Sequence, residues 1–181
     1  MTDAHARPPR DVTLTGERVR LRLVRPDDRD RLREILAEPS VARWWGLGTP
    51  DVAVDGWLED DPDTVVLAIE LEGAVIGSLQ YAEEADPDYR HAGLDLFLDT
   101  AHQGQGLGTD AIRTVARYLF KVRGHRRLTI DPSAANERAI AAYRRVGFRP
   151  VGIMRGYERG PDGTFHDGLL LDLLRGELPE R

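Results

Sequence analysis

The stretch from Gly93 to Phe120 constrains the fold of this chain more than any other part. It holds a short apolar run that ends at Asp99-Thr100, then three glycines within five residues, and then an amphipathic segment. Glycines lack a Cβ atom and let several backbone N–H groups converge on one anion, and the first turn of a helix leaves about four N–H groups without intrahelical partners. The pattern therefore predicts a strand, a tight turn and a helix N-terminus that together bind a pyrophosphate.

The spacing of the glycines distinguishes between phosphate-binding motifs. A P-loop requires Gly-Lys-Ser/Thr, and no lysine follows these glycines. A dinucleotide fingerprint requires Gly-x-Gly-x-x-Gly. The chain instead reads Gln103-x-x-Gly106-x-Gly108, and this stretch resembles the acetyl-CoA pyrophosphate motif of the GNAT N-acetyltransferase superfamily. A glycine-rich turn without a ligand is the alternative that this motif alone leaves open.

A second motif follows the predicted helix. From Asn136 the chain reads Asn-x-x-Ala-x-x-x-Tyr-x-x-x-Gly-Phe, directly after a short apolar strand. Asn136, Ala139 and Tyr143 stand at i, i+3 and i+7 and share one helix face, although ordinary helix packing would also account for Tyr143. GNAT proteins resemble this arrangement closely. With both motifs in order, the chain is identified as a member of that superfamily over roughly Val19 to Leu174.

The resemblance implies the GNAT fold, an α/β (mixed α+β) domain with one central mixed, mostly antiparallel sheet and helices on both faces. The hydrophobic patterns agree with it. We expect helices over residues 26–36, 50–58, 106–122 and 136–146, and strands over 19–24, 64–71, 74–81, 93–98, 127–131, 149–157 and 166–174. We expect residues 1–11 to form a flexible arm and residues 12–181 to form a single acetyltransferase domain.

The resemblance also implies acetyl-CoA as co-substrate and a set of residues that bind it. In this reading Asn136 offers its amide to the pantetheine arm, Ala139 leaves room for the arm, and Tyr143 places its hydroxyl near the thioester sulfur. A backbone N–H near Phe97 or Leu98 polarises the thioester carbonyl. The complete expected set is Phe97, Leu98, Gln103, Gly104, Gly106, Leu107, Gly108, Thr109, Asn136, Ala139 and Tyr143.

Acetyl transfer to a primary amine requires a neutral amine, a donor to the thioester oxygen and a proton for the leaving thiolate. Asp95 is the first catalytic candidate, because a lone carboxylate between Leu94 and Leu96 is costly in a central strand unless it faces a cleft or a partner. It would hold the ammonium and take its proton, directly or through water. A buried aspartate that caps neighbouring backbone is the alternative. Tyr143 is the candidate that protonates the thiolate.

Three short segments narrow the resemblance to the aminoglycoside 6′-N-acetyltransferases: Arg43-Trp-Trp-Gly, Gly93-Leu-Asp-Leu and Thr129-Ile-Asp-Pro-Ser. The segment from Tyr157 to Gly168 resembles the ribosomal-protein-type N-terminal acetyltransferases as much. Three functions therefore stay open: acetylation of an aminoglycoside 6′-amine, acetylation of a protein N-terminus or lysine, and non-catalytic binding of acyl-CoA. The residues expected to contact a cationic substrate are Trp45, Glu84, Asp88, Asp95 and Asp131.

Composition limits the partners further. The chain has 25 basic and 31 acidic residues, which does not suggest a nucleic-acid partner. Residues 59–99 hold twelve acidic residues and one basic, whereas residues 100–181 hold nine acidic and fourteen basic. This asymmetry fits either a solvated acidic face or a cleft with a basic cofactor wall and an acidic substrate wall. There is no cysteine and no apolar run of membrane-spanning length. We expect a cytoplasmic protein without a metal or membrane, and a homodimer through exposed strands stays open.

Overall fold

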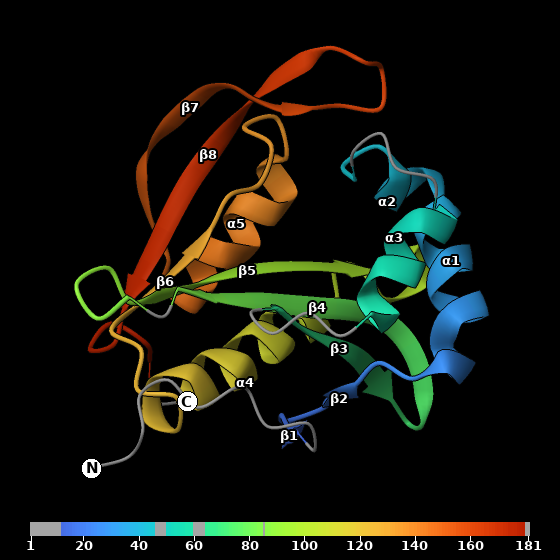
Figure 1. The fold of residues 1–181 in the computed structure, drawn as a ribbon, viewed down its shortest axis with the longest axis horizontal. Helices are drawn as coiled ribbons and strands as arrows, with labels where there is room; N and C mark the ends of the chain where they lie inside the picture. The colour runs from blue at the N-terminus through green and yellow to red at the C-terminus, as the bar shows by residue number, and fades with distance from the viewer. Residues whose placement is uncertain (1–11, 46–49, 60–63, 85, 180–181) are drawn as a thin grey trace.

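The structure, a computed structural model, describes residues 12–45, 50–59, 64–84 and 86–179. The arm expected at residues 1–11 lies outside the described residues. Eight strands form one sheet in the order β1-β2-β3-β4-β5-β6-β8-β7 (Figure 1). Strands β5 and β6 are parallel, and every other neighbouring pair is antiparallel. The expected mixed, mostly antiparallel sheet is therefore confirmed.

The expected elements are present with small shifts at their ends, and α3 and β3 have the limits expected from the sequence. Strand β4 runs three residues further than expected, and β1, α2 and the short helix η2 were not expected. The strands are β1 Thr13–Thr15, β2 Arg20–Leu23, β3 Thr64–Leu71, β4 Ala74–Glu84, β5 His91–Leu98, β6 Arg127–Ile130, β7 Arg149–Arg159 and β8 Phe165–Leu174. The helices are η1 Pro26–Asp28, α1 Arg29–Ala37, α2 Pro39–Ala42, α3 Pro50–Leu58, η2 Thr100–His102, α4 Leu107–Lys121 and α5 Glu137–Val146. Among the described helices, none is long and apolar enough to cross a membrane.

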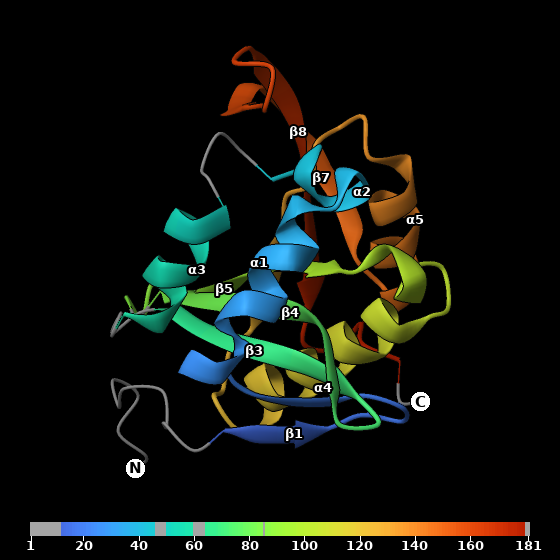
Figure 2. The same ribbon diagram turned by 90° about the vertical axis from the view of Figure 1, so that its right-hand side faces the viewer.

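Helices cover both faces of the sheet (Figures 1 and 2). Successive side chains of a strand point to opposite faces, so β5 contributes to two separate clusters. Leu94 and Leu98 pack in the cluster that contains α4 and α5. Phe97 packs in the second cluster with α1, α2 and α3. The sheet therefore separates two apolar layers, and β5 has a side chain in each.

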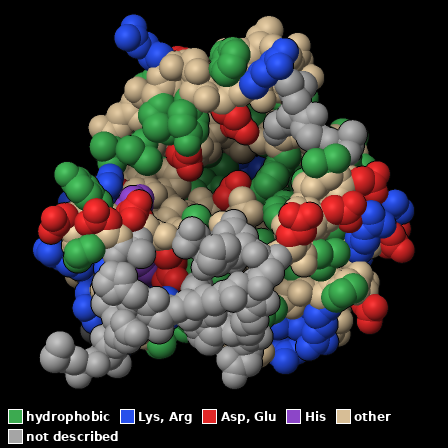
Figure 3. Space-filling view, viewed as in Figure 1, with side chains coloured by type: hydrophobic (Ala, Val, Ile, Leu, Met, Phe, Trp, Pro, Cys, Tyr) green, Lys and Arg blue, Asp and Glu red, His purple; other side chains and the backbone are tan. Residues whose placement is uncertain are grey.

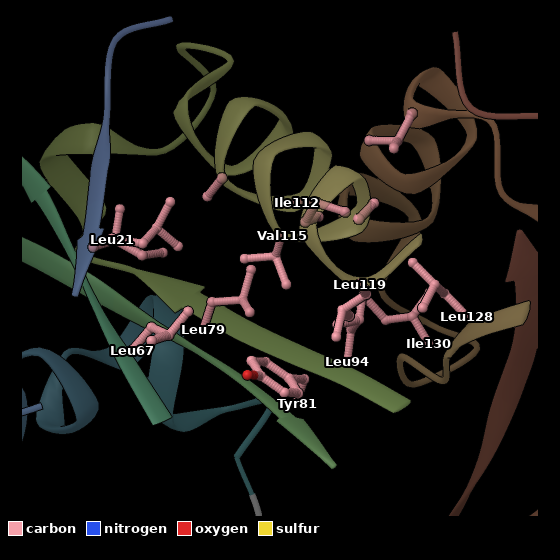
Figure 4. Packing of buried hydrophobic residues seen from close by; sticks show 14 of the residues in the cluster. Leu21, Leu67, Leu79, Tyr81, Leu94, Ile112, Val115, Leu119, Leu128 and Ile130 are labelled. Carbon is pink, nitrogen blue, oxygen red and sulfur yellow. The ribbon is translucent and has the colours of Figure 1, made fainter. Parts of the chain in front are cut away.

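The larger core lies between α4 and the centre of the sheet, where side chains from α4 point toward those of the strands (Figure 4). Ile112, Val115 and Leu119 are at most 1% exposed and belong to the apolar face expected from the sequence. Full burial of one such side chain stabilises the fold by about 1.5–3 kcal/mol. This packing fixes α4, and with it the glycine loop at its N-terminus, against the sheet.

Strands β5 and β6 are paired over a short length only. Their pairing begins with Ala92 opposite Leu128 and ends with Leu94 opposite Ile130. Strand β5 nevertheless continues along β4 as far as Leu98. Beyond Leu94, the edge of β5 that faces β6 therefore has no strand partner.

The chain after β6 follows β8 and not β5. Leu169 N donates to Pro132 O at 2.9 Å, and Ala134 N donates to Asp167 O at 2.8 Å. Pro132 has no N–H group and cannot extend a ladder. Beyond this point β5 continues beside β4, and the chain after β6 continues beside β8. The gap between these two parts of the sheet forms the site described next.

Candidate active site

A cavity of about 680 Å³ opens where β5 and β6 separate. Residues from α2, β5, the glycine loop, α4, the β6–α5 loop, α5 and β7 line it. Figure 3 shows a hollow on this face of the molecule, with acidic side chains around it. The elements that meet here are far apart in the sequence, and the fold alone brings them together.

Most of the residues expected at the site line this one cavity. Leu107 does not, because its side chain is fully buried in the core beneath the loop. Glu84 and Asp88 are also absent from the lining. The expected residues that line the cavity are Trp45, Asp95, Phe97, Leu98, Gln103, Gly104, Gly106, Gly108, Thr109, Asp131, Asn136, Ala139 and Tyr143.

Glu84 and Asp88, expected on the substrate wall, lie near the other end of β5. Glu84 is opposite His91, the first residue of β5, and Asp95 stands four residues further along the strand. At ~3.3 Å per residue, this separates Glu84 from Asp95 by roughly 13 Å along the strand. Asp88 lies in the turn between β4 and β5. The acidic residues around the turn between β4 and β5 have the charge expected of a substrate wall, but they lie at the opposite end of β5 from the cavity.

The glycine loop has the geometry of an anion site. Gly104 and Gly106 have φ values of +75° and +82°, which other residues adopt only with strain. A Cβ at either position would meet no atom within 4 Å, so the loop is open above both glycines. The first helical bond runs from Asp110 N to Gly106 O at 3.0 Å. The N–H groups of Leu107, Gly108 and Thr109 precede it and have no partner within the helix.

Asp110 anchors this helix start to the other end of the sheet. Its carboxylate accepts hydrogen bonds from the backbone N–H groups of Glu17, Arg18 and Val19 at 2.9, 2.8 and 3.0 Å. Arg18 also donates from Nη1 to Gln105 O at 2.8 Å. The turn between β1 and β2 therefore holds both the loop and the first turn of α4.

The side chain of Gln103 is engaged with the protein. Its Nε2 atom donates to Leu98 O at 2.7 Å and to Ser40 Oγ at 3.3 Å. Both amide hydrogens of Gln103 are used in these bonds. The side chain joins the end of β5 to α2, and no amide hydrogen remains for a phosphate oxygen.

Leu98 and Phe97 direct their backbone groups to opposite sides. Asp99 N donates to Ile76 O on β4 at 2.9 Å, so the Leu98 carbonyl of the same trans peptide points away from β4. A Cβ on Gly77 of β4 would lie 2.1 Å from Phe97 O, so the Phe97 carbonyl points toward β4. The N–H and C=O groups of one strand residue point the same way. Leu98 N–H therefore faces the gap, and Phe97 N–H does not.

The N-terminal half of α5 brings the second motif to the cavity. Asn136 caps the helix, and its Oδ1 atom accepts from Ala139 N at 3.2 Å. Its amide hydrogens and the second lone pair of Oδ1 are therefore available to a ligand. Tyr143 is 7% exposed, and burial together with the charges of Asp95 and Asp131 raises the pKa of its hydroxyl. The tyrosine is therefore protonated at neutral pH and can donate a hydrogen bond.

Asp95 lies in the cavity on the face of β5 that carries Phe97. The side chain is exposed to solvent within the open cavity, and partial desolvation by the surrounding protein raises the pKa of its carboxyl to about 7. The negative charges of Asp131 and Glu158 raise this pKa further. Hydrogen bonds from Leu96 N–H and from the Gln80 side chain lower it in part. The carboxyl can therefore both hold and release a proton near neutral pH.

Three consecutive residues of β7, Tyr157, Glu158 and Arg159, also line the cavity, and the sequence motifs did not indicate them as site residues. Tyr157 donates its hydroxyl hydrogen bond to Asp131, which raises the pKa of Tyr157 to about 12. Burial and the charge of Asp131 raise the pKa of Glu158. Tyr157 lies within an irregularity in the pairing of β7 with β8, and Glu158 is the first paired residue after it. The hydrophobic pattern of a strand gives no sign of such a shift.

Gly168 on β8 provides the space that this arrangement needs. A Cβ there would lie 2.9 Å from Cδ1 of Tyr157 and 3.1 Å from Cε of Met154. Gly156 N donates to Asp167 Oδ1 at 2.8 Å, which pins the irregular part of β7 to β8. A glycine within an apolar strand is the signal that could have indicated the close approach of another side chain.

An aromatic cluster forms the wall beside Asp95. The ring centroid of Phe97 lies 5.0 Å from that of Trp45, nearly perpendicular, and 5.7 Å from that of Trp57, nearly parallel. Trp44 also lines the cavity and carries the Arg43 guanidinium 4.6 Å above its ring. Both adjacent tryptophans therefore face the cavity, and Trp45 also packs against the smaller core.

Comparison with known proteins gives concordant similarities. The acetyltransferase (GNAT) domain family matches residues 18–149. Aminoglycoside N(6′)-acetyltransferase type 1 of Klebsiella pneumoniae is 32% identical over 172 residues, which cover 84% of this chain and 82% of that protein. A putative ribosomal N-acetyltransferase of Bacillus subtilis is 23% identical over 178 residues, which cover 92% and 93%. The structure of Mycobacterium smegmatis RimJ in complex with CoA-disulfide is similar in fold, with a TM-score of 0.82 at 24% identity, over 93% of this chain and 90% of that one.

Proposed function

Since the chain belongs to the GNAT family of acetyl-CoA-dependent N-acetyltransferases, we propose that its acceptor is the 6′-amine of an aminoglycoside. The observation that carries this proposal is the convergence of three carboxylates on one cavity. Asp95 comes from β5, Asp131 from the end of β6, and Glu158 from β7. Burial, and after it the repulsion from neighbouring carboxylates, raises the pKa of Asp95 and of Glu158, and a ligand with several ammonium groups would relieve the repulsion.

Groups of the protein at the cavity suit the successive parts of the acetyl donor. The free N–H groups at the start of α4 suit a pyrophosphate, and the unpaired edge of β5 suits an extended amide chain such as pantetheine. Arg138 and Arg145 of α5 line the cavity and provide positive charge near phosphates. The donor supplies an activated acetyl thioester, and the chain's own residues have to orient it and handle the protons.

In the proposed reaction, Asp95 takes the proton from the ammonium of the acceptor, directly or through water. Its raised pKa of about 7 makes it a better base than an ordinary aspartate, whose pKa is about 3.9. The amine nitrogen then forms a bond to the acetyl carbon as the carbon–sulfur bond breaks. Positioning contributes more than basicity, because deprotonation of an amine with a pKa of about 8–9 costs only about 1–3 kcal/mol at pH 7.

Leu98 N–H and the Tyr143 hydroxyl would act on the donor. Leu98 N–H faces the gap and would donate to the thioester oxygen as negative charge develops there, a contribution of roughly 3 kcal/mol in comparable sites. Tyr143 would give its proton to the departing thiolate and would regain one from the acetylated nitrogen, which loses its second proton as the amide forms. Among the described residues, no protein acceptor holds the Tyr143 hydroxyl, so it is available for that role.

The test is a free-thiol assay with acetyl-CoA against aminoglycosides, polyamines and peptides with free N-termini. The proposal expects turnover of aminoglycosides that carry a 6′-amine and none of analogues with a 6′-hydroxyl. Mass spectrometry of the product locates the added acetyl group. Efficient turnover of the 6′-hydroxyl analogues at another amine would contradict the proposed position, and exclusive turnover of peptides would contradict the proposed class.

Acetylation of a protein N-terminus is the second candidate, and the exposed apolar surface of the β7–β8 hairpin favours it. Ile153 and Phe165 are 55% and 67% exposed, and this hairpin extends past α5 (Figure 1). Apolar groups beside an acceptor site can bind a polypeptide. The peptide arm of the same assay separates the two candidates.

A further inference from the structure

Four side chains connect α2 to the end of β5 through consecutive hydrogen bonds. Thr100 donates from N and from Oγ1 to Glu38 Oε2, at 2.6 and 2.5 Å. Thr100 Oγ1 and Ser40 Oγ lie 2.6 Å apart. Ser40 Oγ in turn accepts from Gln103 Nε2 at 3.3 Å. Gln103 completes the series with its 2.7 Å bond to Leu98 O.

The hydrogens in this series have one consistent order. A carboxylate can only accept, so the hydroxyl hydrogen of Thr100 goes to Glu38. Thr100 Oγ1 must then accept from Ser40, and the lone pairs of Ser40 Oγ are left to accept from Gln103. The order fixes Gln103 with both amide hydrogens engaged, one by Ser40 and one by Leu98.

The bond to Leu98 acts on the residue that the acetyl-transfer reaction uses. The N–H and C=O groups of Leu98 both face the gap between β5 and β6, where no strand holds them. Gln103 holds the carbonyl and leaves the N–H free. The Leu98–Asp99 peptide is thereby held from both sides, by β4 through Asp99 N and by Gln103 through Leu98 O, at the last residue of β5.

We propose that Gln103 is a positioning residue for acetyl transfer, which orients Leu98 N–H toward the thioester oxygen, and that its side chain does not bind the pyrophosphate. The inference rests on the acetyl-transfer chemistry proposed above but not on the identity of the acceptor amine. It departs from the expectation that Gln103 belongs to the phosphate-binding set. Ser40, Thr100 and Glu38 act through Gln103 by fixing its amide.

Gln103→Met tests the proposal, because methionine keeps the length of the side chain and removes both donor hydrogens. Gln105→Met is the matched control, since Gln105 is an exposed glutamine of the same loop whose Nε2 donates to Ala101 O at 2.7 Å, away from the cavity. The first measurement is the infrared carbonyl frequency of bound acetyl-CoA, isotope-labelled at the thioester carbon. The second is the affinity for CoA by titration calorimetry. Neither measurement needs an acceptor amine.

In the wild-type protein the bound carbonyl frequency should lie below that of free acetyl-CoA, because a hydrogen bond weakens the C=O bond. In Gln103→Met it should return most of the way to the free value, with the Kd for CoA within about twofold and kcat about tenfold lower on whichever amine turns over. Gln105→Met should behave as wild type. Ser40→Ala, which leaves Gln103 in place, should shift the frequency in the same direction by a smaller amount, and it provides the test if Gln103→Met does not fold.

Three results would overturn the proposal. An unchanged frequency in Gln103→Met means that the glutamine does not orient Leu98. A Kd for CoA at least tenfold weaker means that its amide binds a phosphate, since a hydrogen bond to a charged group contributes that much affinity. A wild-type protein whose bound thioester absorbs at the free frequency has no polarising donor to orient. Failure of the aminoglycoside assay alone changes none of these readings.

Discussion

The interaction between Asp131 and Asp95 leads to a testable shift in the pH dependence of catalysis. The pKa of Asp95 is about 7, and the charge of Asp131 is the second cause of its rise, after burial. Asp131→Asn keeps the shape of the side chain and removes the charge. The ionised form of Asp95 then loses a repulsive neighbour, and its pKa should fall. For a like charge in a partly hydrated cavity we expect a decrease of about one unit, or ~1.4 kcal/mol.

The sign and size of the effect on activity follow from this decrease. Asp95 has to be ionised to accept a proton, so kcat/KM rises with pH through the pKa of Asp95 in the free enzyme. Near pH 6, roughly a tenth of the wild-type carboxyl is ionised if its pKa is about 7, against roughly half in the variant if its pKa is about 6. Relative to its own plateau, the variant should therefore be about fivefold more active near pH 6.

The assay is acetyl-CoA-dependent thiol release across the pH range, with each profile divided by its own plateau. This normalisation removes any loss of substrate affinity caused by the missing charge, and the ionisation of the amine itself is common to all profiles. Glu137→Gln is the control, since Glu137 is an exposed acidic residue of α5 outside the cavity lining. A profile of Asp131→Asn that coincides with the wild-type profile, or moves to higher pH, would refute the electrostatic reasoning.

Three further predictions concern Asp95, Gly106 and the charge of the acceptor. Asp95→Asn should lower kcat/KM at least tenfold with nearly unchanged affinity for acetyl-CoA, and wild-type turnover would remove Asp95 from the mechanism. Because the fold raises the pKa of Asp95 to about 7, the folded state loses stability as pH rises from about 4 to about 7, so the same variant should have the higher Tm above that range in thermal melts. Gly106→Val should abolish CoA binding in calorimetry, because valine is strained at a φ of +82° and would change the conformation of the loop. Circular dichroism should stay native, because no atom lies within 4 Å of the added Cβ. Retained CoA binding would contradict the pyrophosphate assignment. KM for the acceptor should rise with ionic strength, and a salt-independent KM would argue against a polycation.

The fold was largely predictable because its local signals agree with its tertiary packing. The apolar stripe of α4 and the glycine at position 147, which follows the end of α5, agree with the elements expected from the sequence. The hairpin between β3 and β4 turns at Glu72 and Gly73, which both have positive φ values, as the short turn requires. Short elements such as β1 carry too few residues for a periodic signal.

The site was predictable where a motif, or a lone carboxylate in an apolar strand such as Asp95, marked a residue. Gly106, Asn136 and Tyr143 line the cavity. The two motifs indicated these residues because each motif has a fixed position relative to a helix. Glu158 was missed because its position depends on how β7 pairs with β8. Glu84 was expected at the substrate wall but does not line the cavity, because charge composition indicates the sign of a surface but not its position along a strand. Register and strand irregularities are properties of the assembled sheet.

The acidic cavity also bears on which kind of acceptor fits. A single ammonium group beside Asp95 would leave the negative charges of Asp131 and Glu158 without a counter-charge from the ligand. The pKa of Glu158 is already raised by burial and by the charge of Asp131. A ligand with several ammonium groups would meet these carboxylates together, and the aromatic wall of Trp45 and Phe97 provides an apolar surface beside them. Repulsion among carboxylates destabilises the free protein, and a polycation converts that cost into binding affinity. A peptide N-terminus carries one ammonium group and would gain less, so the charges of the cavity support the proposed aminoglycoside acceptor more than a protein acceptor.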